Sequence, residues 1–86
     1  MVKTVADLEC SNHMRKIFFN NCMEDLTFEE LGELRYLELY AWFGVDWAMA
    51  SNIQDMLANN GITMAATRED HYAHMEKVRA RKRGLI

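Results

Sequence analysis

The sequence predicts an all-α protein, a compact bundle of four or five short helices that forms one domain over residues 1–86. Proline is absent from the chain, which favours helices because proline interrupts them. Helix-start signals recur, and the clearest is Thr27 followed by Glu30. The stretch from Tyr36 to Met49 holds both tryptophans, two tyrosines and a phenylalanine. Aromatic side chains bury the largest areas, so we expect most of the core energy in this stretch.

The first part of the chain predicts two short helices or one kinked helix. Thr4 is a candidate N-cap, with Asp7 three residues later at the capping-box position. The apolar pattern changes phase near Ser11, which is suited to cap a second short helix. The pair Asn20 and Asn21 indicates where that helix ends.

A longer helix is predicted to start after Thr27 and to continue to Gly44. Thr27 is the N-cap, Glu30 closes the capping box, and Leu26 and Leu31 occupy the staple positions. Its later part is apolar on nearly every side. Such a helix must be covered on all sides, by the rest of the bundle or by a second copy of the chain.

The next helix is expected over Trp47–Asn59, with Asp46 as its N-cap. Its end is predicted to be a Schellman motif, in which Gly61 takes the left-handed conformation and Ile62 folds back on Leu57.

The last predicted helix is basic toward its end. Thr67 with Asp70 forms a candidate capping box, and Tyr72 and Met75 contribute to a thin apolar stripe. The cations that follow suit the negative end of the helix dipole.

Composition indicates a cytoplasmic protein. The chain has no apolar run long enough to cross a bilayer, and its N-terminal region carries acids where a signal peptide needs an apolar segment. Two cysteines are too few for a secreted disulfide scaffold. No phosphate-binding loop or hydrolase motif is present, so we expect neither an enzyme nor a cofactor.

Four residues raise the question of a metal site. Cys10 with His13, and His71 with His74, are pairs three residues apart that each place two zinc ligands on one helical face. Neither pair lies in a zinc-finger or zinc-knuckle context, and free cysteines are commonly small core residues. We therefore expect no metal site.

Charge is unevenly distributed, and this favours a binding function. Seven acids but one base lie between Glu24 and Asp46, whereas bases predominate after Arg68. We interpret the chain as a small regulatory or inhibitor protein that binds a protein partner stoichiometrically, of the kind that phages and mobile elements encode. A partner that itself binds nucleic acid would suit the acidic surface. The expected contact residues are Glu29, Glu30, Glu33, Glu38, Tyr36, Tyr40 and Trp42.

The aromatic stretch also predicts self-association. Its apolar surface is wider than one small bundle easily covers, so we expect a homodimer. The residues expected at that contact are Tyr36, Leu39, Tyr40, Trp42, Phe43 and Trp47.

The alternative function is a small DNA-binding regulator that uses the basic last helix to contact phosphates. The residues expected to bind nucleic acid in that case are Lys77, Arg79, Arg81, Lys82 and Arg83. The turn around Gly61 argues against a helix-turn-helix, because Leu57 and Thr67 occupy the positions where that motif has a small and an aliphatic residue.

Overall fold

The computed structural model confirms the all-α prediction. It describes residues 2–84, apart from the side chain of Arg83, and no strand occurs among them. The elements are the 3₁₀ helix η1 (Val5–Asp7) and the helices α1 (Asn12–Asn20), α2 (Phe28–Leu31), α3 (Tyr36–Leu39), α4 (Trp47–Asn59) and α5 (Arg68–Gly84).

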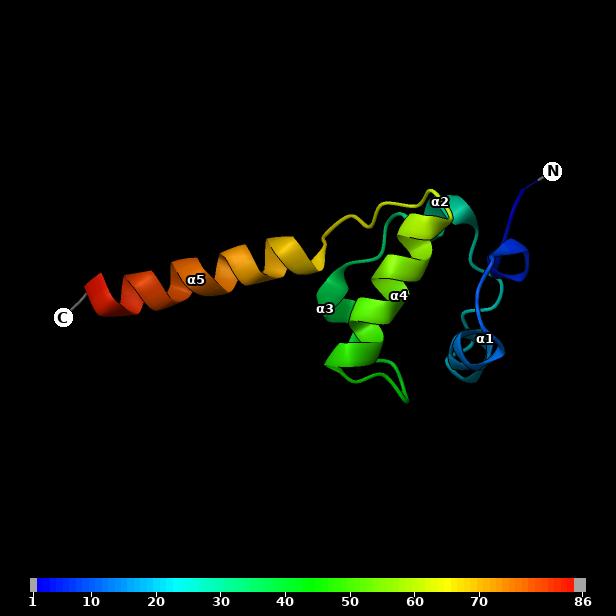
Figure 1. Ribbon diagram of the computed structural model, residues 1–86, viewed down its shortest axis with the longest axis horizontal. Coiled ribbons are helices and arrows are strands. Elements are labelled where there is room, and N and C mark those ends of the chain that lie inside the picture. Colours follow the sequence, from blue (N-terminus) through cyan, green and yellow to red (C-terminus); the bar gives the residue numbers. More distant parts are fainter. Residues whose placement is uncertain (1, 85–86) are drawn as a thin grey trace.

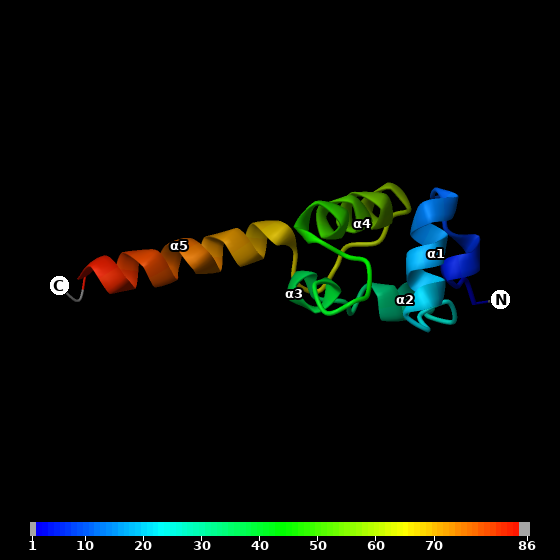
Figure 2. The ribbon, with the colours of Figure 1, turned by 90° about the horizontal axis from the view of Figure 1, so that it is seen from below.

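The molecule is extended, so the prediction of a compact bundle is wrong. The described residues span 54 × 25 × 18 Å, and the radius of gyration is 14.9 Å, whereas a compact domain of this length has about 12 Å. Figures 1 and 2 show the reason: helices η1 to α4 gather into one body, and α5 runs away from it. We call residues 2–67 the body and residues 73–84 the arm.

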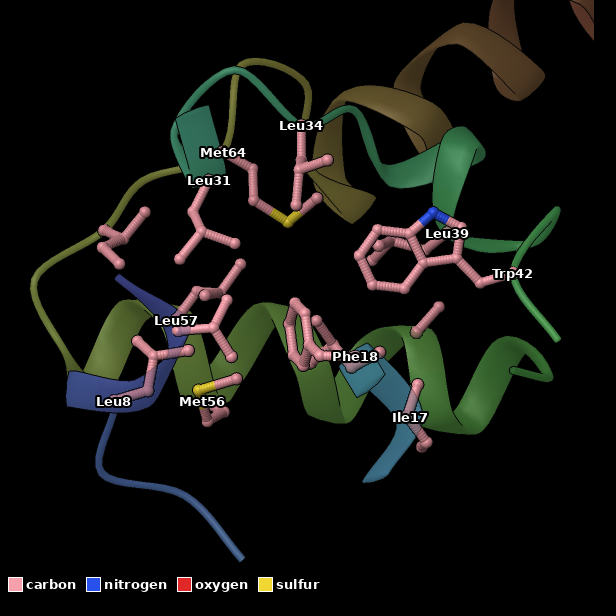
Figure 3. Packing of buried hydrophobic residues seen from close by; sticks show 14 of the residues in the cluster. Leu8, Ile17, Phe18, Leu31, Leu34, Leu39, Trp42, Met56, Leu57 and Met64 are labelled. Atoms are coloured by element: carbon pink, nitrogen blue, oxygen red, sulfur yellow. The ribbon is translucent and has the colours of Figure 1, made fainter. Parts of the chain in front are cut away.

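The body is built around α4. Apolar residues from η1 and α1 cover one side of this helix, and residues between Leu31 and Trp42 cover another (Figure 3). Phe18 and Trp42 meet edge to face, with ring centroids 5.2 Å apart. The buried residues of α4 are Ala50, Ile53, Gln54, Met56 and Leu57.

The predicted helix starts are confirmed. Thr4 and Thr27 each cap a helix through a complete capping box, and Ser11 and Asp46 accept hydrogen bonds from the third residue of α1 and α4. At α5, the Thr67 amide donates to Asp70 Oδ2 (3.0 Å) and the Asp70 amide donates to Thr67 Oγ1 (3.3 Å). The phase change near Ser11 separates η1 from α1, as predicted.

The continuous helix predicted from Thr27 to Gly44 is wrong. The chain forms only the short helices α2 and α3, because Arg35 between them is extended (φ −109°, ψ 142°). The extended segment pairs with the chain after α4: the Tyr36 amide donates to Ala66 O (2.7 Å), and the Ala65 amide donates to Leu34 O (2.9 Å). These long-range hydrogen bonds replace the local ones that a continuous helix would have made.

Two asparagines at helix ends connect distant segments of the body through side-chain hydrogen bonds. Asn21 Oδ1 accepts from the Phe43 amide (2.7 Å) while Asn21 Nδ2 donates to Phe43 O (3.0 Å). In the same way Asn60 Oδ1 accepts from the Glu9 amide (2.9 Å) and Asn60 Nδ2 donates to Glu9 O (3.1 Å). Each side chain therefore satisfies both backbone groups of one distant residue.

The Schellman ending of α4 is confirmed. Gly61 has φ +79°, which is in the left-handed region that favours glycine. The Ile62 amide donates to Leu57 O (2.9 Å), and both side chains are buried in the core. The chain then runs back along the body toward Arg35 before α5 begins.

Candidate interaction surfaces

The aromatic stretch divides between core and surface. Tyr36 is 1% exposed and Trp42 is 8% exposed, so these two predicted contact residues belong to the core and offer little surface to a partner. Leu39 is also buried. By contrast, Phe43 is 77% and Trp47 is 62% exposed. The sequence pattern required that the apolar stretch be covered on all sides. The body itself provides a large part of that cover.

An aromatic cluster joins the body to α5. The buried ring of Tyr36 meets Tyr40 edge to face at 5.4 Å between centroids and lies 6.0 Å from His71. His71 in turn lies 5.7 Å from Tyr72. The Tyr36 hydroxyl donates to Trp47 O (3.4 Å). Three exposed residues therefore adjoin the buried Tyr36: Tyr40 through its ring, Trp47 through its backbone carbonyl, and Tyr72 next to His71. We call these three residues the junction patch.

Burial is the main reason for the raised pKa of Tyr36 within this cluster, and the neighbouring Tyr40 raises it further. The pKa of Tyr72 is raised as well, by desolvation first and then by Tyr36. Both hydroxyls therefore stay neutral near pH 7. These two tyrosines consequently add no charge where α5 meets the body.

All four predicted acidic contact residues are exposed on the segment that contains α2 and α3. We call Glu29, Glu30, Glu33 and Glu38 the acidic face. The Glu30 carboxylate accepts from the Thr27 amide (3.1 Å) as part of the α2 capping box. Within the described residues none of the four forms an ion pair with a basic side chain, since the ion pairs found there involve Arg68.

Gln54 fixes the start of α5 on α4. Its Oε1 accepts from the Arg68 amide (2.7 Å), and its Nε2 donates to Glu69 Oε2 (3.0 Å). The Arg68 guanidinium donates to Ser51 Oγ and forms ion pairs with Asp55 (2.9 Å) and Glu69 (3.1 Å). We call these five residues the joint. The sequence analysis did not identify it, although Gln54 lies on the inner face of α4 with Ala50 and Leu57, where a polar residue needs a partner.

The joint changes the pKa of its charged groups. Glu69 has its pKa lowered to about 2, mainly by the hydrogen bond from Gln54 and then by a backbone hydrogen bond and by Arg68. The pKa of Arg68 is raised, first by its hydrogen bond to Asp55 and then by the one to Glu69. Both groups therefore stay charged over the physiological range.

The predicted nucleic-acid-binding residues lie in the arm. Lys77, Arg79, Arg81 and Lys82 are exposed, while the side chain of Arg83 lies outside the described residues. Arg79 and Lys82 are three residues apart on one side of α5, and Lys77 and Arg81 are four apart on the opposite side. The cations therefore surround the helix instead of forming one basic face.

The structure does not bring the Cys10–His13 pair and the His71–His74 pair together. Cys10 and His13 lie at the start of α1, and His71 and His74 lie in α5, at the other side of the body (Figure 1). No group of three or more cysteine, histidine or acidic side chains suited to a metal ion occurs in the described part of the chain.

A hollow of about 340 Å³ lies beside the junction, where the segment before α3 faces the start of α5. Its polar lining includes Arg35, Thr67 and Asp70 together with His71 and His74. His71 Nδ1 is buried and makes no hydrogen bond within the described residues.

No helix among residues 2–84 combines the length and the hydropathy that a bilayer crossing requires. Comparisons with protein-family models, with curated proteins and with solved structures give no significant match.

Proposed function

We propose that the protein acts without catalysis, as a small regulator or inhibitor that binds a protein partner through the acidic face. The observation that carries this proposal is the set of four exposed carboxylates on α2, α3 and the segment between them, without a basic counterpart in the described residues. Unpaired charge of one sign steers an oppositely charged partner and speeds association. A basic surface, such as one that holds nucleic acid, supplies the complementary charge.

An exposed tyrosine and an exposed leucine beside these carboxylates support the same function. Tyr40 follows α3 directly and is exposed, and Leu37 within α3 is 57% exposed. Tyrosine combines a large apolar area with a hydroxyl, which is why it is enriched at protein interfaces. The proposed contact therefore has an apolar part at α3 and a charged part that extends to α2.

The test compares affinity capture from the native host by the wild-type chain and by the double variant Glu33→Lys/Glu38→Lys, with mass spectrometry of the bound proteins. We expect the variant to lose a basic protein that the wild type retains. With that protein purified, the variant should associate about tenfold or more slowly at low salt, because charge complementarity acts mainly on the association rate.

A matched pair of single variants controls for net charge. Glu33→Lys removes a carboxylate from the acidic face, and Glu9→Lys makes the same change at an exposed position on the linker before α1. Only the first should slow association. Equal capture by wild type and double variant, with folding intact by circular dichroism, would contradict the proposal.

The second candidate is DNA binding by the arm, and the observation that favours it is the exposure of four cations on a helix that projects from the body. Because these cations surround the helix, only about half of them could face one groove of a duplex. We expect no retardation of duplex DNA at ~50 mM salt. Binding that is micromolar or tighter and falls steeply by ~200 mM salt would instead favour this candidate, and Arg79→Ala/Lys82→Ala should then abolish it.

A further inference from the structure

Helix α5 carries a thin apolar stripe that is partly exposed and that begins where the helix leaves the body. Tyr72 is 43% and Met75 is 40% exposed, and Val78 follows three residues later on the same side. Beyond Asp70, α5 makes no side-chain hydrogen bond to the body in the part of the chain that the structure describes. A short helix without tertiary contacts is marginally stable in water, so the arm needs a partner to remain helical.

The charged residues along this stripe are concentrated toward one end. Tyr72 lies at its start and belongs to the junction patch. Arg79 and Lys82 follow Met75 by four and seven residues, so they lie on the same side of the helix. Arg68 precedes Tyr72 by four residues on the same side, but Asp55 and Glu69 neutralise its charge. The stripe is therefore aromatic and without excess positive charge at one end, and cationic at the other.

We propose that a second copy of this chain covers the stripe, through antiparallel pairing of the two α5 helices. Met75 of each copy then packs against Val78 of the other. The cations Arg79 and Lys82 of each copy lie over Tyr72 of the other, where cation–π contact stabilises them. The contact is the same on both copies, as two-fold symmetry requires.

Charge excludes the parallel arrangement. Parallel helices would place Arg79 and Lys82 of both copies side by side, so that like charges repel along the basic end. It would also leave the aromatic ends without cations. The antiparallel arrangement separates the two sets of cations and places each over the aromatic end of the other copy.

The length of the arm fits this geometry. Residues 73–84 extend about 18 Å at the helical rise of 1.5 Å per residue. An antiparallel neighbour of the same length therefore reaches from the middle of α5 to its start, where Tyr40 and Trp47 of the junction patch are exposed. The two bodies lie at opposite ends of the helix pair. The dimer contact is thus made by α5, and not by the buried Tyr36, Leu39 and Trp42 that the sequence analysis included.

Sedimentation equilibrium from micromolar to submillimolar concentration tests the pairing. The wild type should move from 10.1 kDa to twice that mass. Met75→Glu places a charge in the apolar contact and should raise the dissociation constant about tenfold or more. Phe19→Glu is the matched control: this side chain is 66% exposed on α1, at the far side of the body, and its variant should dimerise as the wild type does.

A mixing experiment tests the orientation. In Arg79→Glu/Lys82→Glu the cationic end of the stripe becomes acidic. If the helices are antiparallel, this variant pairs poorly with itself and with wild type, since its new acids replace the cations over Tyr72 of the other copy and the cation–π contact is lost. Enhanced pairing in the mixture with wild type would show a parallel arrangement and overturn the proposal.

Two further outcomes would also overturn it: a wild-type monomer over the whole concentration range, or equal weakening by Met75→Glu and Phe19→Glu. Helix content gives an independent readout. Dilution below the dissociation constant should lower the far-ultraviolet helix signal, because the separated arms lose their partner. The variant Glu33→Lys/Glu38→Lys should leave the mass unchanged, so failure of the pairing and failure of the acidic face are distinguishable.

Discussion

The helices α4 and α5 are the two longest of the chain, and they are held in opposite ways. Helix α4 has five buried residues, which pack against the rest of the body along the length of the helix. Helix α5 has none among its described side chains and is held only near its start, by the joint and by the aromatic cluster around Tyr36. Both begin with a side-chain cap. The comparison shows that capping fixes where a helix begins, whereas burial decides how much stability the helix shares with the rest of the molecule.

The largest expected difference comes from truncating one apolar residue in each helix. Leu57 of α4 is fully buried, so Leu57→Ala should lower the free energy of unfolding by about 3 kcal/mol. Met75 of α5 is exposed, and Met75→Ala should change it by less than about 0.5 kcal/mol. Urea unfolding followed by circular dichroism, at a concentration where the chain is monomeric, measures both. Similar losses would mean that α5 is packed as α4 is.

A smaller effect should follow from weakening each helix by the same amount. Ala58 in α4 and Ala80 in α5 are both exposed, and glycine at either position costs about 1 kcal/mol of helix stability. Ala58→Gly should lower the unfolding midpoint, because α4 unfolds with the body. Ala80→Gly should leave that midpoint unchanged and reduce the helix signal of the arm, measured from the α-carbon chemical shifts. If both variants lowered the midpoint equally, arm and body would form one cooperative unit.

Local signals in the sequence predicted the helix starts well and the long-range pairing poorly. Caps at Thr27 and Asp46 depend on residues three positions apart, so the sequence alone is sufficient to find them. The break between α2 and α3 depends on hydrogen bonds between residues 34–36 and 65–66, which no local pattern reveals. Gly32 gave no signal either: a Cβ there would lie 3.6 Å from Thr63 O, an ordinary van der Waals distance, so the returning chain does not require a glycine.

The candidate surfaces also have features that the sequence predicted and features that it did not. Exposure of the acidic face could be predicted from its charge, because carboxylates without partners remain in water. Which aromatic residues are buried could not, since Tyr36 and Tyr40 are one helical turn apart and only the first is buried. The direction of α5 could not be predicted either. It depends on the pairing of Gln54 with Arg68 and Glu69, which are fourteen and fifteen residues away in the chain.

The smallest effect concerns the pH range over which the joint holds α5. The pKa of Glu69 is about 2 in the folded protein against an ordinary value of 4.5, so folding favours the charged carboxylate. Its contribution to stability is therefore complete above about pH 4.5 and is lost as the pH falls through about 2. Because the hydrogen bond from Gln54 is the largest cause, Gln54→Leu should move the titration midpoint of Glu69 upward, toward 4.5. Asn52→Ala, an exposed change on the same helix, should not. An NMR titration of the Glu69 carboxyl carbon measures the midpoint, and a wild-type value near 4.5 would show that the joint does not hold the carboxylate as the structure describes.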